Sequence, residues 1–359
     1  MTTLSKQVIF LTLLLISLLT SCSNDDDANL QAINHTTVEN LLSNIDFQGY
    51  AIVTKNGNDL VRQGFGLANK STEMPQDYNL AYRIGSVTKT LTAAAIVQLK
   101  RDGLISSFNQ TLNEFDADFP NGNQITIAHL LSHQSGIPEY QLVVEQAFEE
   151  GLTLDEDDIY EVITELVSEN GLSFTPGSNK QYCNSNYLIS ALLVQQLSGM
   201  TYHEYIQQKI FNPLGMNNSY KGTDEINANT HAQGYLNEST NSTYPIAIPF
   251  GAGDFSSTPA DMEVWTNAIK TNWFTESEKA EIFANNVPSG FVDFGLGWFT
   301  SQEGETTMYW HGGDINGYWS MIGFIPEYEA TIVLLSNQQD NTGLQRNTII
   351  QHLLTTEFK

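Results

Sequence analysis

The stretch AYRIGSVTKTLTAAAIVQLKRDG, residues 81–103, contains a Ser-x-x-Lys quartet at Ser86 and Lys89. The quartet follows a short run of strand-forming residues and a glycine, and it opens a segment whose apolar residues repeat with helical spacing. Residues three apart on a helix share one face, so the two side chains are expected to be neighbours, about 5–6 Å apart at Cβ. An amine in that position can take the proton of a serine hydroxyl, which makes Ser86 a candidate nucleophile.

By itself the quartet is weak evidence, because both residue types are common enough for about one chance match in a chain of this size. The ordinary interpretation is an exposed first helical turn with a solvated lysine. If Ser86 is catalytic, the free backbone N–H groups of that first turn can stabilise a developing oxyanion. The rest of the sequence decides between the two interpretations.

Residues 1–21 have the pattern of a secretory signal peptide. Lys6 precedes the apolar run Val8–Leu19, which is too short to span a bilayer because a spanning helix needs about 20 residues. The run ends in Leu19-Thr20-Ser21-Cys22, which resembles a bacterial lipobox, where the cysteine becomes the lipidated first residue. The alternative is an ordinary signal peptide with an incidental cysteine. We therefore expect an exported lipoprotein of the cell envelope, held by Cys22 at the periplasmic or surface face of an outer membrane.

Residues 22–37 are polar and include three consecutive aspartates, so we expect a disordered acidic tether before a single domain over residues 38–359. The formal net charge of −26 argues against a nucleic-acid partner and against electrostatic attachment to anionic lipid. Cys183 is the only cysteine besides Cys22. No intrachain disulfide is therefore expected, and the fold must depend on its core.

Strand patterns occupy both ends of this domain, and helical patterns occupy its middle. Near the beginning, two strand-forming runs flank Asn56-Gly57, a strong hairpin signal that argues against a doubly wound parallel sheet. The sequence thus predicts a layer of strands and helices built from both ends, an inserted helical layer, and a site in the crevice between them. Further strands are predicted at 295–300, 306–310, 318–324 and 330–336, helices at 38–45, 125–133, 154–168, 187–197 and 344–354, and loops shaping the crevice at 141–155 and 223–261.

Tyr182-Cys183-Asn184 forms a second candidate motif on a loop before an apolar helix. A phenol beside a lysine ammonium can have a lowered pKa, since a nearby positive charge favours the anion. The amide of Asn184 can hold both a lysine and a substrate amide. The same pattern occurs at Tyr235-Leu236-Asn237, but no helix follows it there to brace it.

The third candidate is His311-Gly312-Gly313, which follows an apolar run. Adjacent glycines at the end of a strand indicate the close approach of another backbone or of a ligand. The alternative is a glycine turn with an exposed histidine.

Together, in this order and about 95 and then about 130 residues apart, the three motifs resemble the serine β-lactamase and penicillin-binding-protein superfamily, in particular its class C, D-alanyl-D-alanine carboxypeptidase and esterase branch. The resemblance covers the chain from about residue 38 to its end. It implies an α+β fold, an antiparallel β-sheet flanked by helices plus an all-helical lobe. Other similar segments are HLLSHQSGIPEY (129–140), FTPGSNKQYCNSNYLIS (174–190), PLGMNNS (213–219), GAGDFSSTPADMEVW (251–265) and WHGGDINGYWSMIGFIPE (310–327).

The resemblance also implies roles for the matched residues. Ser86 would be the acylated nucleophile, Lys89 would help to deprotonate it, and Tyr182 would be the general base in acylation and in activating the hydrolytic water. Asn184 would orient Lys89 and the substrate. The substrate-binding strand would contribute His311, Gly313 and Asp314, with the backbone N–H groups of Ser86 and Asp314 forming an oxyanion hole in which each donor contributes about 3 kcal/mol.

The sequence departs from the family pattern at His311. Penicillin-recognising members usually carry Lys-Thr-Gly here, and that lysine helps to bind a carboxylate. A histidine with the ordinary pKa of about 6.5 is mostly neutral at pH 7, so neutral ester or amide substrates become more plausible. The class A deacylating glutamate motif is not evident either.

We therefore expect a serine hydrolase that opens an ester, amide or β-lactam bond of a small molecule or peptide. The alternatives are a D-alanyl-D-alanine carboxypeptidase or D-peptidase acting on peptidoglycan peptides, and a non-catalytic surface-binding lipoprotein of the same fold. A metal enzyme is disfavoured because Leu130 stands where the H-E-x-x-H pattern needs glutamate between His129 and His133. An α/β-hydrolase is disfavoured because no G-x-S-x-G elbow occurs. No metal or other cofactor is expected.

Overall fold

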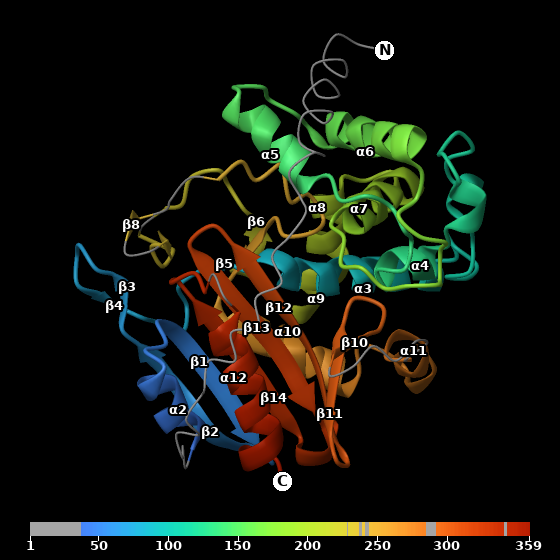
Figure 1. The fold of residues 1–359 in the computed structure, drawn as a ribbon. Coiled ribbons are helices and arrows are strands. Elements are labelled where there is room, and N and C mark those ends of the chain that lie inside the picture. The colour runs from blue at the N-terminus through green and yellow to red at the C-terminus, as the bar shows by residue number, and fades with distance from the viewer. Residues whose placement is uncertain (1–36, 228, 237–238, 241–243, 285–291, 341–342) are drawn as a thin grey trace, which may run out of the picture.

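A seven-stranded antiparallel sheet in the order β10-β11-β12-β13-β14-β1-β2 forms the centre of the protein (Figure 1). The computed structural model describes residues 37–227, 229–236, 239–240, 244–284, 292–340 and 343–359. Strands from the two ends of the chain meet where Ala51 of β1 lies opposite Leu334 of β14. The strands are β1 Gly49–Lys55, β2 Asn58–Phe65, β10 Val292–Phe294, β11 Phe299–Glu303, β12 Thr306–Ile315, β13 Tyr318–Ile325 and β14 Ala330–Ser336.

The predicted hairpin is confirmed at the N-terminal end of this sheet. Asn56 and Gly57 connect β1 to β2, and both have positive φ angles, 51° and 78°. Two positive φ values are what a type I′ turn requires, and Asn-Gly tolerates them best.

Both faces of the sheet are covered, which is why β13 and β14 consist almost entirely of apolar residues. On one face, α2 (Val38–Asn44) and α12 (Leu344–His352) pack with alternate strand residues such as Met321 and Leu334. The intervening residues, including Ile322 and Val333, belong to the second cluster, which continues into the helices on the other face.

A helical lobe lies beside the sheet, separated from it by α3 (Thr88–Arg101) and α10 (Pro259–Thr271) (Figure 1). Its longest helices are α6 (Glu156–Asn170) and α7 (Ser185–Ser198), and α7 packs directly on α3. The α+β fold predicted from the sequence is therefore confirmed. The remaining elements are β3 Leu67–Asn69, β4 Met74–Pro75, β5 Tyr82–Arg83, α4 Ile127–Leu131, α5 Gln141–Glu149, α8 Tyr202–Ile206, α9 Asn212–Leu214, β6 Tyr220–Lys221, β7 Tyr235–Leu236, β8 Ser239–Thr240, β9 Phe255–Ser257 and α11 Glu276–Ile282.

Four local predictions differ from the structure. The strand expected at 295–300 begins only at Phe299, because Gly297 has a φ of 80° and the Gly295 N–H closes a turn on the Trp298 carbonyl. The strand expected at 306–310 continues to residue 315. The expected loops at 141–155 and 223–261 contain α5, β9 and the start of α10. Thr258 caps α10 and Pro259 follows it, which is a regular helix-start signal.

The predicted signal peptide and nearly all of the tether precede residue 37, outside the described residues. Within the described part of the chain, no helix has the length and apolarity needed to cross a bilayer.

Candidate active site

Ser86 lies in a tight 3-10 turn, η1 (Gly85–Val87), that links β5 to α3. The Ser320 hydroxyl donates a hydrogen bond of 2.6 Å to the carbonyl of Ile84, just before the turn. Gly85 adopts a φ of 50°, a backbone conformation that glycine accepts without strain. Ser86, the candidate nucleophile, therefore lies at the N-terminal end of α3, where it is half-buried.

Lys89 is completely buried, one helical turn beyond Ser86. Its Nζ donates to three oxygens, Ser86 Oγ at 3.0 Å, Asn184 Oδ1 at 2.7 Å and the carbonyl of Ala252 at 2.8 Å. Desolvation disfavours the charged amine and lowers the pKa of Lys89 to about 7. Near neutral pH a large fraction of Lys89 is therefore uncharged and able to accept the Ser86 proton.

The ring of Tyr182 lies next to the amine of Lys89, with its centroid 4.8 Å from Nζ. The residue keeps 37 % of its surface exposed. Desolvation nevertheless raises the pKa of its phenol, and this outweighs the lowering effect of its hydrogen bond with Ser86. The lowered pKa expected for Tyr182 is thus not found, because the raising effect of desolvation is larger than the lowering effects of Ser86 and Arg346.

His133 supports Tyr182 from behind. The two ring centroids are 4.4 Å apart, and the backbone N–H of Cys183 donates to His133 Nδ1 at 3.1 Å. Burial lowers the pKa of His133 well below its usual value, so the ring is neutral. His133 thus packs against the ring of Tyr182 and accepts from the backbone of Cys183. Among the described residues, no three histidine, cysteine, aspartate or glutamate side chains are grouped so that they could hold a metal ion.

The residues to which the resemblance assigns an oxyanion hole come together because β12 approaches η1 very closely. A Cβ atom on Gly313 would lie 2.1 Å from the Ile84 carbonyl oxygen and 2.9 Å from the Ser86 nitrogen, and one on Gly85 would lie 3.0 Å from the Asp314 nitrogen. Only glycines permit this approach. The backbones of Ser86 and Asp314 are thereby brought close together, at the place where the family resemblance implies an oxyanion hole.

His311 lies on the same strand but carries no positive charge. It is almost fully buried, and its ring stacks on Phe299 with centroids 4.3 Å apart. Burial lowers the pKa of His311 to about 3. A histidine in this state cannot replace a lysine as the partner of a carboxylate.

The cavity in front of Ser86 measures about 260 Å³, and both segments predicted to shape the crevice, 141–155 and 223–261, contribute to its lining, although no single residue within them stood out from the sequence. Gln141 and Glu145 come from α5, and Tyr244 comes from the segment expected to be loop. Gln141 Oε1 accepts a hydrogen bond of 2.7 Å from Asn184 Nδ2. The i, i+4 spacing of Gln141 and Glu145 beside buried Val144 was the signal that could have predicted this helix.

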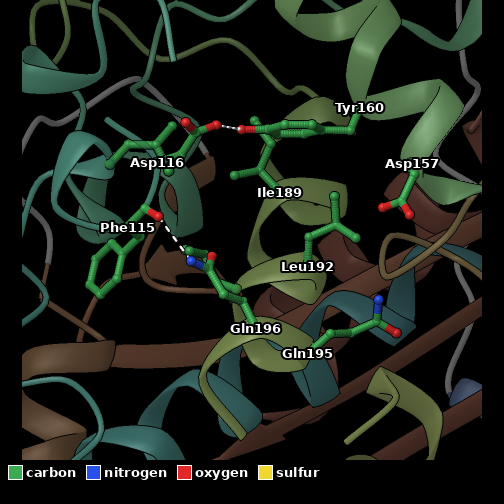
Figure 2. A pocket seen from close by; sticks show the side chains of 10 residues that line it. Phe115, Asp116, Asp157, Tyr160, Ile189, Leu192, Gln195 and Gln196 are labelled. Carbon is green, nitrogen blue, oxygen red and sulfur yellow. Dashed lines mark hydrogen bonds between the residues drawn. The ribbon is translucent and has the colours of Figure 1, made fainter. Parts of the chain in front are cut away.

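A larger cavity, about 590 Å³, lies in the helical lobe (Figure 2). Asp116 and the Tyr160 hydroxyl are hydrogen-bonded to each other at its edge, and Ile189 and Leu192 supply apolar surface. None of the predicted site residues lines it. The sequence motifs therefore converge on the smaller cavity at the junction of sheet and lobe.

The antiparallel sheet, its helical lobe and a site at their junction define the β-lactamase/transpeptidase fold. The chain belongs to the Beta-lactamase family, which it matches over residues 36–356. A curated relative is the putative penicillin-binding protein PbpX of Bacillus subtilis (strain 168), 29 % identical over 89 % of this chain and 78 % of the relative. The predicted family is thereby confirmed, and the relatives support a serine hydrolase-like function.

Solved structures show the same fold. A penicillin-binding protein from Bacillus halodurans superimposes with a TM-score of 0.74 at 24 % identity, over 88 % of this chain and 98 % of that one. The D-amino acid amidase from Ochrobactrum anthropi SV3, complexed with L-phenylalanine, gives 0.72 at 22 % identity, over 89 % and 98 %. At these identities the two likenesses concern the fold alone.

Proposed function

We propose that the protein is a serine hydrolase that forms an acyl-enzyme on Ser86 and hydrolyses an ester or amide bond. The observation that carries this proposal is the buried Lys89, whose Nζ lies 3.0 Å from Ser86 Oγ and whose pKa is lowered to about 7. A base with a pKa near the working pH is well matched to proton transfer.

In acylation, the neutral Nζ of Lys89 takes the Ser86 proton while Oγ attacks the substrate carbonyl carbon. The N–H groups of Ser86 and Asp314 bind the oxyanion that forms. When the intermediate collapses, the bond to the leaving group breaks, and the leaving atom takes a proton from the Tyr182 hydroxyl, which regains one from Lys89.

In deacylation, a water molecule attacks the acyl carbon and gives its proton through Tyr182 to Lys89. Ser86 then leaves as the alcohol and recovers that proton. Tyr182 acts as a relay in this scheme because its raised pKa keeps the phenol protonated. This revises the general-base role that the family resemblance implied for it.

Ester and amide substrates are preferred in this proposal over β-lactams and peptidoglycan carboxypeptide ends. The neutral His311 offers no charge for a substrate carboxylate. Arg346 is near this strand, but both carboxylate oxygens of Asp314 accept from it at 2.8 Å. The substrate is a small molecule or peptide, in keeping with the cavity volume of about 260 Å³.

The lipoprotein character and envelope location remain part of the proposal. They depend on the sequence around Cys22 and on the acidic tether that leads from it to the folded domain.

The test is hydrolysis of p-nitrophenyl acetate and a chromogenic cephalosporin, measured side by side with Ser86→Ala as the blank. We expect ester turnover that the variant lacks, with unchanged circular dichroism. Labelling by a fluorophosphonate that requires Ser86 would support the acyl-enzyme. Activity retained in Ser86→Ala would overturn the assignment, and efficient lactam turnover would make β-lactamase the better description. No turnover and no labelling would favour a binding lipoprotein.

A further inference from the structure

The charges that line the Ser86 cavity are all negative. Among its described lining residues, Glu145 and Asp314 carry carboxylates and none is lysine or arginine. Asp314 is already neutralised, since both its oxygens accept from Arg346 at 2.8 Å. Glu145 is therefore the cavity's uncompensated anion.

Glu145 is held rigidly in this position. Its Oε1 accepts from Gln141 Nε2 at 2.8 Å and from the Tyr244 hydroxyl at 3.0 Å. Both hydrogen bonds end on the same oxygen, and within the described part of the chain Oε2 receives none. A fixed carboxylate with one free oxygen is suited to accept hydrogen bonds from a ligand cation.

Glu145 is also connected to the reacting group. Asn184 Nδ2 donates to Gln141 Oε1 at 2.7 Å, and Asn184 Oδ1 accepts from Lys89 at 2.7 Å. A continuous chain of hydrogen bonds thus joins Ser86, Lys89, Asn184, Gln141 and Glu145. Glu145 and Ser86 therefore line the same cavity, and this chain of hydrogen bonds fixes their positions relative to each other.

The nearby Glu139 does not compete for the same role. It accepts the backbone N–H groups of Asn184 and Gln141, and its charge raises the pKa of Lys89 against the effect of burial. It is not among the residues lining the cavity. Glu139 therefore serves Lys89, whereas Glu145 faces the space that the substrate occupies.

We propose that Glu145 binds a free ammonium group in the acyl half of the substrate, so that the preferred substrates are amides or esters of amino acids, or short peptides with a free N-terminus. This inference rests on the proposed function. An α-ammonium group lies two bonds from the carbonyl carbon that Ser86 attacks. Ser86 and Glu145 line the same small cavity of about 260 Å³, so one substrate can present its carbonyl carbon to Ser86 and its ammonium group to Glu145. A cation placed against a carboxylate that hydrogen bonds already hold in position contributes to orientation as well as affinity.

The test compares alanine p-nitroanilide with N-acetyl-alanine p-nitroanilide, each as the D and L form, at pH 7. Acetylation removes the charge and leaves the scissile bond unchanged. We expect kcat/KM to favour the free amine by about tenfold or more. Glu145→Gln, which keeps the size and one oxygen acceptor, should reduce that ratio to near one. Glu149→Gln, an exposed glutamate at the end of the same helix, should leave the ratio unchanged.

The outcomes separate this inference from the proposed function. If neither anilide is cleaved faster than by Ser86→Ala, hydrolysis of p-nitrophenyl acetate separates the two proposals. Ester turnover leaves the hydrolase proposal standing and overturns the ammonium site, whereas no ester turnover overturns both. Cleavage of both at similar kcat/KM in the wild type overturns only the ammonium site. Should Glu145→Gln be misfolded by circular dichroism, the wild-type ratio decides. It should fall as sodium chloride is added, because salt screens the attraction, and a ratio independent of salt would contradict the proposal.

Discussion

The Nζ of Lys89 lies 2.7 Å from Oδ1 of Asn184, although 95 residues separate the two in the sequence. Lys89 belongs to α3, next to the sheet, and Asn184 immediately precedes α7 of the helical lobe. The contact therefore forms only when the helical lobe packs on α3. That packing also removes water from the amine, which is the cause of its lowered pKa.

Activity should follow the neutral form of Lys89. Because burial lowers its pKa to about 7, the amine loses its proton as pH rises through that value. We expect kcat/KM for an ester to rise about tenfold per unit below pH 7 and to level off above it. Initial rates between about pH 5 and pH 9 measure this.

The same profile identifies the titrating group. His311, with a pKa of about 3, cannot produce an inflection near neutrality. Lys89→Arg carries a guanidinium that keeps its proton throughout the range, so it should lose activity by orders of magnitude and show no inflection. A flat wild-type profile would argue against Lys89 as the base.

Tyr182→Phe should slow turnover by about 10²–10⁴-fold, the usual contribution of a positioned proton-transfer group. The variant keeps the ring that packs on His133 and lies over Lys89, and loses only the hydroxyl. Stopped-flow kinetics with an activated ester should then show a burst followed by slow deacylation, because a good leaving group needs the relay less than water does. A steady-state rate within about twofold of wild type would remove Tyr182 from the mechanism.

The sequence predicted the site where the information is local. The Ser86 quartet opens a helix, and Tyr182 precedes another, so short motifs and helical periodicity were sufficient to identify them. The length of β12 was underestimated because two adjacent glycines resemble a turn. Their extended conformation depends on pairing with β13, where Gly312 lies opposite Met321 and Gly313 opposite Ser320.

Helix α5 could not be predicted with the same ease. No side chain caps its N-terminus, and Val144 and Ala147 are its only buried residues. Such a helix depends on packing against the rest of the lobe more than on its own propensity. The segment 141–155 was therefore expected at the crevice but as a loop, and Gln141 and Glu145 were not identified individually. The pKa of Tyr182 was misjudged for a related reason, since desolvation is a property of the assembled site and not of the motif.

Cys22→Ala should release the protein from the membrane. The net charge of −26 provides no attraction to anionic lipid, so attachment would depend on acyl chains at this cysteine. We expect the wild type to incorporate a labelled fatty acid and enter the detergent phase of a Triton X-114 partition, and the variant to do neither. An unlabelled wild type in the aqueous phase would indicate an ordinary signal peptide.

Gly313→Ala should reduce kcat by about 10²–10³-fold, the cost of losing one oxyanion donor. The new methyl group would lie 2.1 Å from the Ile84 carbonyl oxygen and 2.9 Å from the Ser86 nitrogen. Both are backbone atoms, so neither can move without moving the chain around it. Relief requires β12 to move away from η1, which separates the Asp314 N–H from that of Ser86.

Gly312→Ala is the matched control for this variant, because it lies on the same strand and faces the opposite side of the sheet. The three atoms nearest to its methyl group would all belong to the guanidinium of Arg346, with Nε the closest at 2.8 Å. The end of a long side chain can move aside at little cost, so the loss of kcat should be much smaller than for Gly313→Ala. Equal losses in the two variants would mean that strain in β12, and not separation of the two N–H donors, limits the reaction.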